Sequence, residues 1–224
     1  MKTVLITGVS KGIGRALMQK FLDEGFDVMG TAYSGDVPEI HERLSIFDLD
    51  LASSQSIAAC ADSVISTGKK IDILINNAGI LADEDETTVV VDKLRRTLDV
   101  NLIGPVDFTE RLVSSIVSGG HIINISSTAG SLELAGKGES HFPLHYPCYK
   151  ISKAGVNMYT RTLALRLKKD DITVSSVHPG WTKTDMGGEE ADITPEEAAD
   201  GIYSIAVSKP ETGGFWFRGE RLPW

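Results

Sequence analysis

The sequence has little cysteine, no long apolar run and no excess of positive charge, and each shortage excludes a class of protein. Only two cysteines, Cys60 and Cys148, occur in 224 residues, which excludes a disulfide framework and fits a reducing cytoplasm. No stretch approaches the ~20 apolar residues of a membrane span. The first apolar run is only Val4-Leu5-Ile6, too short for a secretory signal. We therefore expect a cytoplasmic protein that does not enter a membrane.

Positive charge is also scarce, because 22 lysines and arginines face 31 aspartates and glutamates, for a net charge of −9. This balance argues against a general nucleic-acid-binding protein, which needs basic surface. The five histidines show no HExxH or similar paired spacing, so we expect no metal site. Apolar residues make up 42% of the chain, enough for one folded domain over residues 1–224.

Apolar, β-branched runs alternate with amphipathic segments along the whole chain. The runs predict strands at 2–7, 26–31, 43–50, 71–77, 120–127, 172–179 and 214–217. The segments between them predict helices at 12–24, 54–66, about 92–117, 147–169 and 195–207. This alternation predicts an α/β, Rossmann-type, doubly wound parallel sheet of about seven strands with helices on both faces. We interpret the glycine-containing segment 130–146 as a loop over a site.

The stretch "TGVSKGIG", residues 7–14, joins the first predicted strand to the first predicted helix. Gly8 would permit a tight exit from the strand, and Gly12 and Gly14 would let backbone and pyrophosphate approach closely. The helix N-terminus would then face the phosphates. A glycine motif in this strand–turn–helix context predicts a dinucleotide site.

The stretch "LHYPCYKISKAG", residues 144–155, holds two tyrosines, each with a lysine four residues later. The pairs are Tyr146 with Lys150 and Tyr149 with Lys153, and helix geometry puts all four side chains on one face. Pro147 suits a first helical turn, which leaves Tyr146 at the cap and Tyr149 in a rigid turn. A proton donor needs the rigid position, so this pattern favours Tyr149, with Tyr146 as a pocket wall or a rival.

Together these motifs resemble the short-chain dehydrogenase/reductase family in its single-domain form. The segments that carry the resemblance are "TGVSKGIG" (7–14), "DLASSQSI" (50–57), "NNAG" (76–79), "VNLIG" (100–104), "NISSTAG" (124–130), "YKISKAG" (149–155) and "HPGWTKTDM" (178–186). Within the family, "GWTKTDMGG" and the final "RLPW" look most like the Sniffer and C-factor-like carbonyl reductases.

The resemblance implies an oxidoreductase that reduces aldehyde or ketone carbonyls, or runs the reverse reaction. By family pattern Tyr149 is the proton donor, and Lys153 lowers the pKa of its phenol and binds the nicotinamide ribose. Ser127 is the second hydroxyl by the family spacing, although its neighbour Ser126 is the alternative. Asn101 completes the set by holding a water near Lys153. The alternative is a dinucleotide-binding signalling or scaffold protein with little turnover.

The same resemblance implies a set of cofactor-binding residues. They are Gly8, Ser10, Lys11, Gly12, Ile13, Gly14, Ser34, Asp50, Leu51, Asn77, Ala78, Gly79, Tyr149, Lys153, Pro179, Gly180, Thr182 and Thr184. An NAD site needs a carboxylate at the tip of the second strand, but Asp27 comes too early and Asp36 too late. Lys11 and Ser34 are candidates for a 2′-phosphate. We expect NADP(H), with NAD(H) possible.

Three further expectations concern the pocket, Cys148 and the oligomeric state. Ser127 and Tyr149 are 22 residues apart, more than the family usually shows, so extra residues must lie within 131–143 and affect the pocket. Cys148 is expected to be structural and not a redox switch. The long helices at about 92–117 and 147–169 form subunit contacts in many family members, which implies a homodimer or homotetramer.

Overall fold

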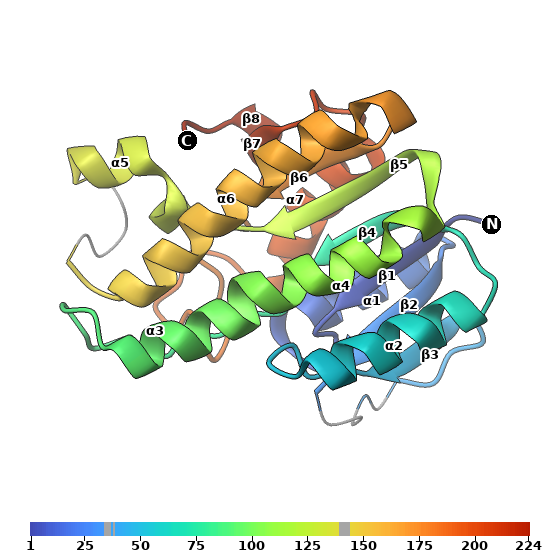
Figure 1. Ribbon diagram of the computed structural model, residues 1–224, viewed down its shortest axis with the longest axis horizontal. Coiled ribbons are helices and arrows are strands. Elements are labelled where there is room, and N and C mark those ends of the chain that lie inside the picture. The colour runs from blue at the N-terminus through green and yellow to red at the C-terminus, as the bar shows by residue number, and fades with distance from the viewer. Residues whose placement is uncertain (34–36, 38, 139–143) are drawn as a thin grey trace.

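An eight-stranded sheet forms the centre of the computed structural model, which describes residues 1–33, 37, 39–138 and 144–224 (Figure 1). The strands are β1 (Thr3–Thr7), β2 (Asp27–Ala32), β3 (Leu44–Asp48), β4 (Ile71–Asn76), β5 (Ile116–Ile125), β6 (Thr173–Val177), β7 (Gly214–Phe217) and β8 (Glu220–Arg221). Their order is β3-β2-β1-β4-β5-β6-β7-β8, and every neighbouring pair is parallel except β7 and β8. The strand order reverses between β1 and β4, which confirms the predicted doubly wound sheet.

Helices cover both faces of the sheet (Figure 1). They are α1 (Gly12–Asp23), α2 (Ser54–Ser66), α3 (Val91–Leu98), α4 (Gly104–Leu112), α5 (Leu132–Lys137), α6 (Pro147–Leu167) and α7 (Pro195–Val207). Side chains of α2, α4 and α6 form one apolar cluster with the sheet, and those of α1 and α7 form the other. Because both faces are covered, the central strands are apolar throughout, and every residue of β1 is buried.

The long helix expected at about 92–117 is wrong in two respects. A five-residue π-helix at Asp99–Ile103 separates α3 from α4, and α4 ends at Leu112. Strand β5 already begins at Ile116, four residues earlier than its predicted start at 120. Short elements β8 and α5 were also not predicted, and α5 lies inside the segment interpreted as a loop.

A chain of buried polar side chains fixes the middle of the sheet to two helices. Asn76 on β4 donates to Thr109 of α4 and to Asn124 of β5, both at 2.8 Å. Asn124 in turn donates to Thr160 of α6 at 2.9 Å, and Ser176 of β6 donates to the same threonine. These bonds fix α6 against the sheet directly behind the carboxyl ends of the strands.

Within the described part of the chain, no helix combines the length and apolar character needed to cross a membrane. The described residues also contain no group of three histidine, cysteine or acidic side chains that could hold a metal ion.

Candidate active site

The glycine turn after β1 is packed closely against neighbouring protein atoms. Gly8 and Gly12 have positive φ angles, +74° and +55°, which favour glycine. A Cβ atom on Gly14 would lie 2.0 Å from the carbonyl oxygen of Gly8, so only glycine fits there. The turn is fixed from the β4 side by Asn77, whose amide donates to the Thr7 carbonyl at 2.9 Å. The turn thus packs the start of α1 tightly against the end of β1, which is the helix–strand packing that dinucleotide-binding turns require.

The end of β5 presents two neighbouring serines that have different roles. Ser126 is 1% exposed and donates to Asn157 of α6 at 2.6 Å. Ser127 caps the short 3-10 helix at Thr128–Gly130 by accepting from the Ala129 N–H at 3.1 Å. That bond uses an acceptor site of the Ser127 hydroxyl and leaves its proton for Tyr149 or a ligand.

Helix α6 begins with an unusual backbone conformation. Tyr146, the N-cap, has a φ of +44°, a left-handed conformation that is rare for a bulky residue. Pro147 follows at the first helical position, and the Lys150 N–H closes the first turn on the Tyr146 carbonyl at 3.1 Å. Tyr149 therefore lies inside a complete turn, as predicted. The rings of Tyr146 and Tyr149 pack edge to face, with their centroids 6.0 Å apart.

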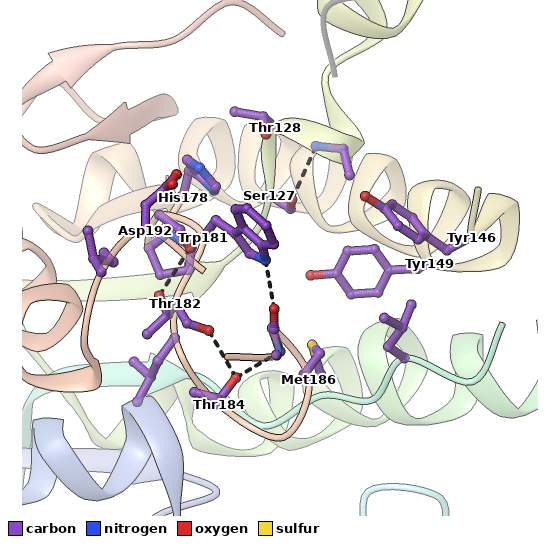
Figure 2. Close-up of a pocket in the computed structure, with 18 of the residues that line it drawn as sticks. Ser127, Thr128, Tyr146, Tyr149, His178, Trp181, Thr182, Thr184, Met186 and Asp192 are labelled. Carbon is purple, nitrogen blue, oxygen red and sulfur yellow. Dashed lines mark hydrogen bonds between the residues drawn. The ribbon is translucent and has the colours of Figure 1, made fainter. Parts of the chain in front are cut away.

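Figure 2 shows the Tyr149 hydroxyl directed into the cavity, on the side where Ser127 and Trp181 lie. Burial raises the pKa of the Tyr149 phenol to about 12, and hydrogen bonding with Ser127 acts in the opposite direction. Loss of hydration is thus the largest effect on this phenol, and the expectation that Lys153 lowers its pKa stays a prediction.

Lys153 lies beneath the tyrosine and is 5% exposed. Its Nζ is 5.4 Å from the centroid of the Tyr149 ring and donates to the Ile125 carbonyl at 2.8 Å. Burial lowers the pKa of the Lys153 ammonium to about 8. Gly130 permits this packing, because a Cβ there would lie 2.5 Å from the backbone of Lys153.

Asn101 lies in the π-helix and is 2% exposed. Its side-chain oxygen accepts from the Ile80 N–H at 2.8 Å, and its amide nitrogen donates to the Ile80 carbonyl at 2.9 Å. The amide nitrogen also donates to Ser152 of α6 at 3.2 Å. Both N–H groups of the side chain are thus used by protein partners, and Asn101 joins the segment after β4 to α6. Its expected role in holding a water stays a prediction, for which Oδ1 retains one acceptor position.

A cavity of about 930 Å³ lies over these groups. Tyr149, Ser127, Tyr146 and several of the expected cofactor contacts line it, and those contacts are Ile13, Pro179, Gly180, Thr182 and Thr184. The loop after β6 forms much of its wall. Trp181 of that loop donates from its indole N–H to the Gly187 carbonyl at 2.8 Å, and Met186 lies beside it (Figure 2).

The residues expected at the adenosine end lie apart from this cavity. Lys11 forms an ion pair of 2.5 Å with Asp185, and both side chains are largely exposed. The Asp50 carboxylate accepts from the Ala52 N–H at 2.9 Å, and Leu51 is buried in the core. Ser34, the other expected phosphate contact, lies outside the described residues, as does Asp36.

Two features of the site were missed by the sequence reasoning. Trp181 was given no role of its own from the sequence, although it directly follows Pro179 and Gly180 and lines the cavity with them. Asp83, from the segment after β4, is fully buried and accepts from the Cys148 N–H at 2.6 Å. No local pattern in the sequence marks that contact, because its two partners are 65 residues apart.

Comparison with known proteins identifies the family. Residues 2–194 match the short chain dehydrogenase family. The chain is 30% identical over 220 residues to 1-hydroxy-2-glutathionyl-2-methyl-3-butene dehydrogenase of Rhodococcus sp. (strain AD45), covering 96% of this chain and 95% of that one.

Solved structures give the same result. An NADPH-bound carbonyl reductase from chicken fatty liver is 27% identical, with a TM-score of 0.87 and coverage of 100% of this chain and 94% of the other. The carbonyl reductase Sniffer of D. melanogaster is 25% identical, with a TM-score of 0.88 and full coverage of both chains.

The fold and the arrangement of hydroxyls and lysine at the carboxyl ends of its strands define a Rossmann-type oxidoreductase. The chain belongs to the short-chain dehydrogenase/reductase family. The predicted likeness to carbonyl reductases of the Sniffer kind is confirmed.

Proposed function

We propose that this protein is an NADP(H)-dependent carbonyl reductase that converts aldehydes or ketones to alcohols, or catalyses the reverse reaction. The observation that supports this proposal is the convergence of Tyr149 and Ser127 on one cavity, with Lys153 buried beneath the tyrosine. A pair of hydroxyl donors beside a buried cation is the arrangement that stabilises an oxygen as it gains negative charge.

The residues of the chain fit a dinucleotide. A Cβ on Gly14 would lie 2.0 Å from the Gly8 carbonyl oxygen, so glycine there permits the close helix–strand packing that dinucleotide sites use. Thr184 extends the site towards the cavity, because its methyl group would lie 3.2 Å from a Cβ on Gly12. Lys11 supplies a positive charge at the edge of the turn, which favours the extra phosphate of NADP(H). The solved carbonyl reductase from chicken, which contains NADPH, supports the same choice.

Each catalytic residue has a distinct task in this proposal. NADPH, when bound, supplies the hydride. Ser127 and Tyr149 donate hydrogen bonds to the carbonyl oxygen, and Tyr149 transfers its proton to that oxygen. Lys153 stabilises the phenolate that remains, because its ammonium lies close to the ring in a site of low polarity. Gly130 holds these groups at the required spacing by letting the segment after β5 touch α6.

The alternative function, a dinucleotide-binding scaffold with little turnover, requires the glycine turn but not the catalytic hydroxyls. The joint presence of Tyr149, Lys153 and Ser127 around one cavity favours the enzyme. Location in the cytoplasm stays a prediction.

The experiment that tests the proposal measures NADPH consumption with a panel of aliphatic and aromatic aldehydes and ketones. Tyr149→Phe removes the proton donor and keeps the ring, and we expect kcat to fall by about 10²–10⁴-fold. Tyr146→Phe tests the rival tyrosine and should change kcat by less than about fivefold. Wild-type turnover in Tyr149→Phe would remove the proposed mechanism. NADPH binding without reduction of any carbonyl would favour the scaffold.

A further inference from the structure

The segment between β4 and α3 is bonded to the first turn of the catalytic helix at several points. The Cys148 N–H donates to the Asp83 carboxylate at 2.6 Å, and the Tyr146 N–H donates to the Glu86 carbonyl at 2.9 Å. The Cys148 thiol adds a weaker contact of 3.8 Å to the Val90 carbonyl. Residues 83–90 thus hold the three residues that directly precede Tyr149.

The first turn of α6 depends on this external support. Tyr146 occupies the N-cap without a side-chain hydrogen bond to the helix, and Pro147 has no N–H. Cys148 therefore carries the first N–H group that needs a partner, and Asp83 provides it from another part of the chain. A carboxylate is also the side chain that the positive end of a helix dipole favours.

The backbone conformation of Tyr146 is a second reason why the first turn of α6 depends on contacts from outside the helix. Tyr146 combines a left-handed φ of +44° with the position before a proline, both of which are unfavourable for a bulky residue. Such a conformation persists only where surrounding contacts hold it. The bond to Asp83 is well protected, because the carboxylate is fully buried.

The same segment is fixed at its other end to the cofactor side of the site. Asn101 holds the backbone of Ile80 in both directions. Asp83 comes three residues after Ile80 and reaches the helix that carries Tyr149 and Lys153. The segment therefore joins the lining after β4 to the catalytic helix as one unit.

We propose that Asp83 is a positioning residue for proton transfer, which fixes the first turn of α6 so that the Tyr149 hydroxyl points at the substrate oxygen. This inference rests on the proposed function of Tyr149. Asp83 does not line the cavity, so its effect is transmitted through the Cys148 N–H and the helix backbone. Cys148 itself is structural, since burial and then the Asp83 carboxylate raise the pKa of its thiol and keep it protonated.

The test compares three variants by steady-state kinetics with NADPH and an aromatic aldehyde that the wild type reduces. Asp83→Ala removes the acceptor, and we expect kcat to fall by about 10–100-fold, because small misplacements of a reacting group have effects of this size. Asp83→Asn keeps an acceptor oxygen of the same reach and should recover most of that loss. Asp92→Asn, the same change at an exposed carboxylate of α3, should leave kcat at the wild-type value.

The Michaelis constant for NADPH separates positioning from general damage. It should stay within about twofold of wild type in every variant, since Asp83 acts on Tyr149 and not on the phosphates. The inference is supported if kcat decreases in the order wild type, Asp83→Asn, Asp83→Ala while the Michaelis constant for NADPH stays constant. A wild-type kcat for Asp83→Ala, a kcat for Asn no higher than for Ala, or a loss confined to the NADPH Michaelis constant overturns it.

Two further measurements keep the outcome decisive. If Asp83→Ala is recovered unfolded, Asp83→Glu takes its place, since one extra methylene displaces the turn while a carboxyl group remains, and the same readings apply. Tyr149→Phe is measured in parallel. If it retains turnover, the proposed function fails and the Asp83 inference fails with it. If it is inactive while Asp83→Ala has a normal kcat, only the Asp83 inference fails.

Discussion

Ser126 donates a hydrogen bond of 2.6 Å to the side-chain oxygen of Asn157 and so joins the end of β5 to the middle of α6. Asn157 also donates a hydrogen bond of 3.1 Å to the Gly130 carbonyl, which joins α6 to the segment after β5. The Ser126 proton is therefore used inside the protein. Its neighbour Ser127 lies near Tyr149 in the cavity (Figure 2), and the proposed function assigns the catalytic role to it.

Alanine substitution of the two serines should separate activity from stability. Ser127→Ala removes a donor to the developing oxyanion, and kcat should fall by about 10²–10³-fold with little change in stability. Ser126→Ala leaves the buried Asn157 oxygen without its donor, which should cost about 1–3 kcal/mol in the free energy of unfolding. Denaturant titration and carbonyl-reduction assays of both variants measure the two effects. The opposite assignment, with Ser126→Ala inactive and Ser127→Ala normal, would show that Ser126 is the catalytic serine.

Lys11 should determine the preference between the two nicotinamide cofactors. Lys11→Ala is expected to raise the Michaelis constant for NADPH by on the order of tenfold, the loss of one charge-assisted contact, and to change that for NADH much less. Lys183→Ala removes the same charge from the exposed surface of the loop that carries Asp185 and serves as the control. Equal effects on both cofactors would contradict the assignment.

The ion pair between Lys11 and Asp185 gives a second prediction for the same site. If Lys11 binds the 2′-phosphate, Asp185 competes with the cofactor for the ammonium. Asp185→Asn should then lower the Michaelis constant for NADPH, by a few-fold at most because the pair is exposed and screened by solvent. The measurement is the same kinetic assay at low ionic strength. An increase for NADPH would indicate that the carboxylate helps to hold the loop over the cofactor.

His121 should make the stability of the protein depend on pH. It is buried between β5, β6 and α7, where Nδ1 donates to the Ala206 carbonyl at 3.3 Å and Nε2 accepts from Ser175 at 2.9 Å. Burial lowers the pKa of the imidazole to about 4 from its ordinary 6.5. The unfolded chain therefore binds a proton that the folded chain does not between these values.

The sign follows from that difference. The contribution of His121 is complete above pH 6.5 and is lost as the pH falls towards 4, by up to about 3 kcal/mol. Unfolding free energies of the wild type and of His121→Gln, measured from pH 8 to pH 4, should therefore converge at acidic pH. Parallel pH profiles for the two proteins would exclude this role for His121.

Helix α6 presents apolar side chains at a spacing of seven residues, namely Ile151, Met158 and Leu165, which are 44%, 63% and 77% exposed. They share one face of the helix. The predicted dimer or tetramer would cover this face. Met158→Glu should then shift the molecular mass measured by light scattering towards the monomer. A wild-type chain that is monomeric at high concentration would contradict the prediction.

Most of the fold could be predicted because it depends on patterns that are local. The β-branched runs of β1, β2, β4 and β6 gave those strands within two residues of their observed ends. The early start of β5 could not be read in the same way, since Ile116 and Val117 continue the apolar spacing of the preceding helix. The π-helix at Asp99–Ile103 was hidden for a related reason, because one extra residue in a turn leaves no clear mark on helical periodicity.

In the candidate site, too, features set by local sequence patterns could be predicted, and features set by residues distant in sequence could not. Tyr149 could be preferred to Tyr146 from the position of Pro147, and the structure places Tyr149 in a complete helical turn. The pKa of its phenol could not be foreseen, since burial comes from residues distant in sequence. Asp83 was missed for the same reason, because the helix it caps begins 64 residues further along the chain.

The loop after β6 has its two ends joined, because Thr182 and Ile193 form a β-bridge and the Lys183 N–H bonds the Ile193 carbonyl at 2.8 Å. Inside it, the Trp181 indole bonds the Gly187 carbonyl, so much of the wall over the cavity is held by its own contacts. A segment anchored at one paired position can be replaced as a cassette without moving the catalytic helix. Residues 188–192, which follow Thr184 and Gly187 and include several residues that line the cavity, are therefore the place to graft other sequences when the protein is to be redesigned for bulkier or smaller reactants.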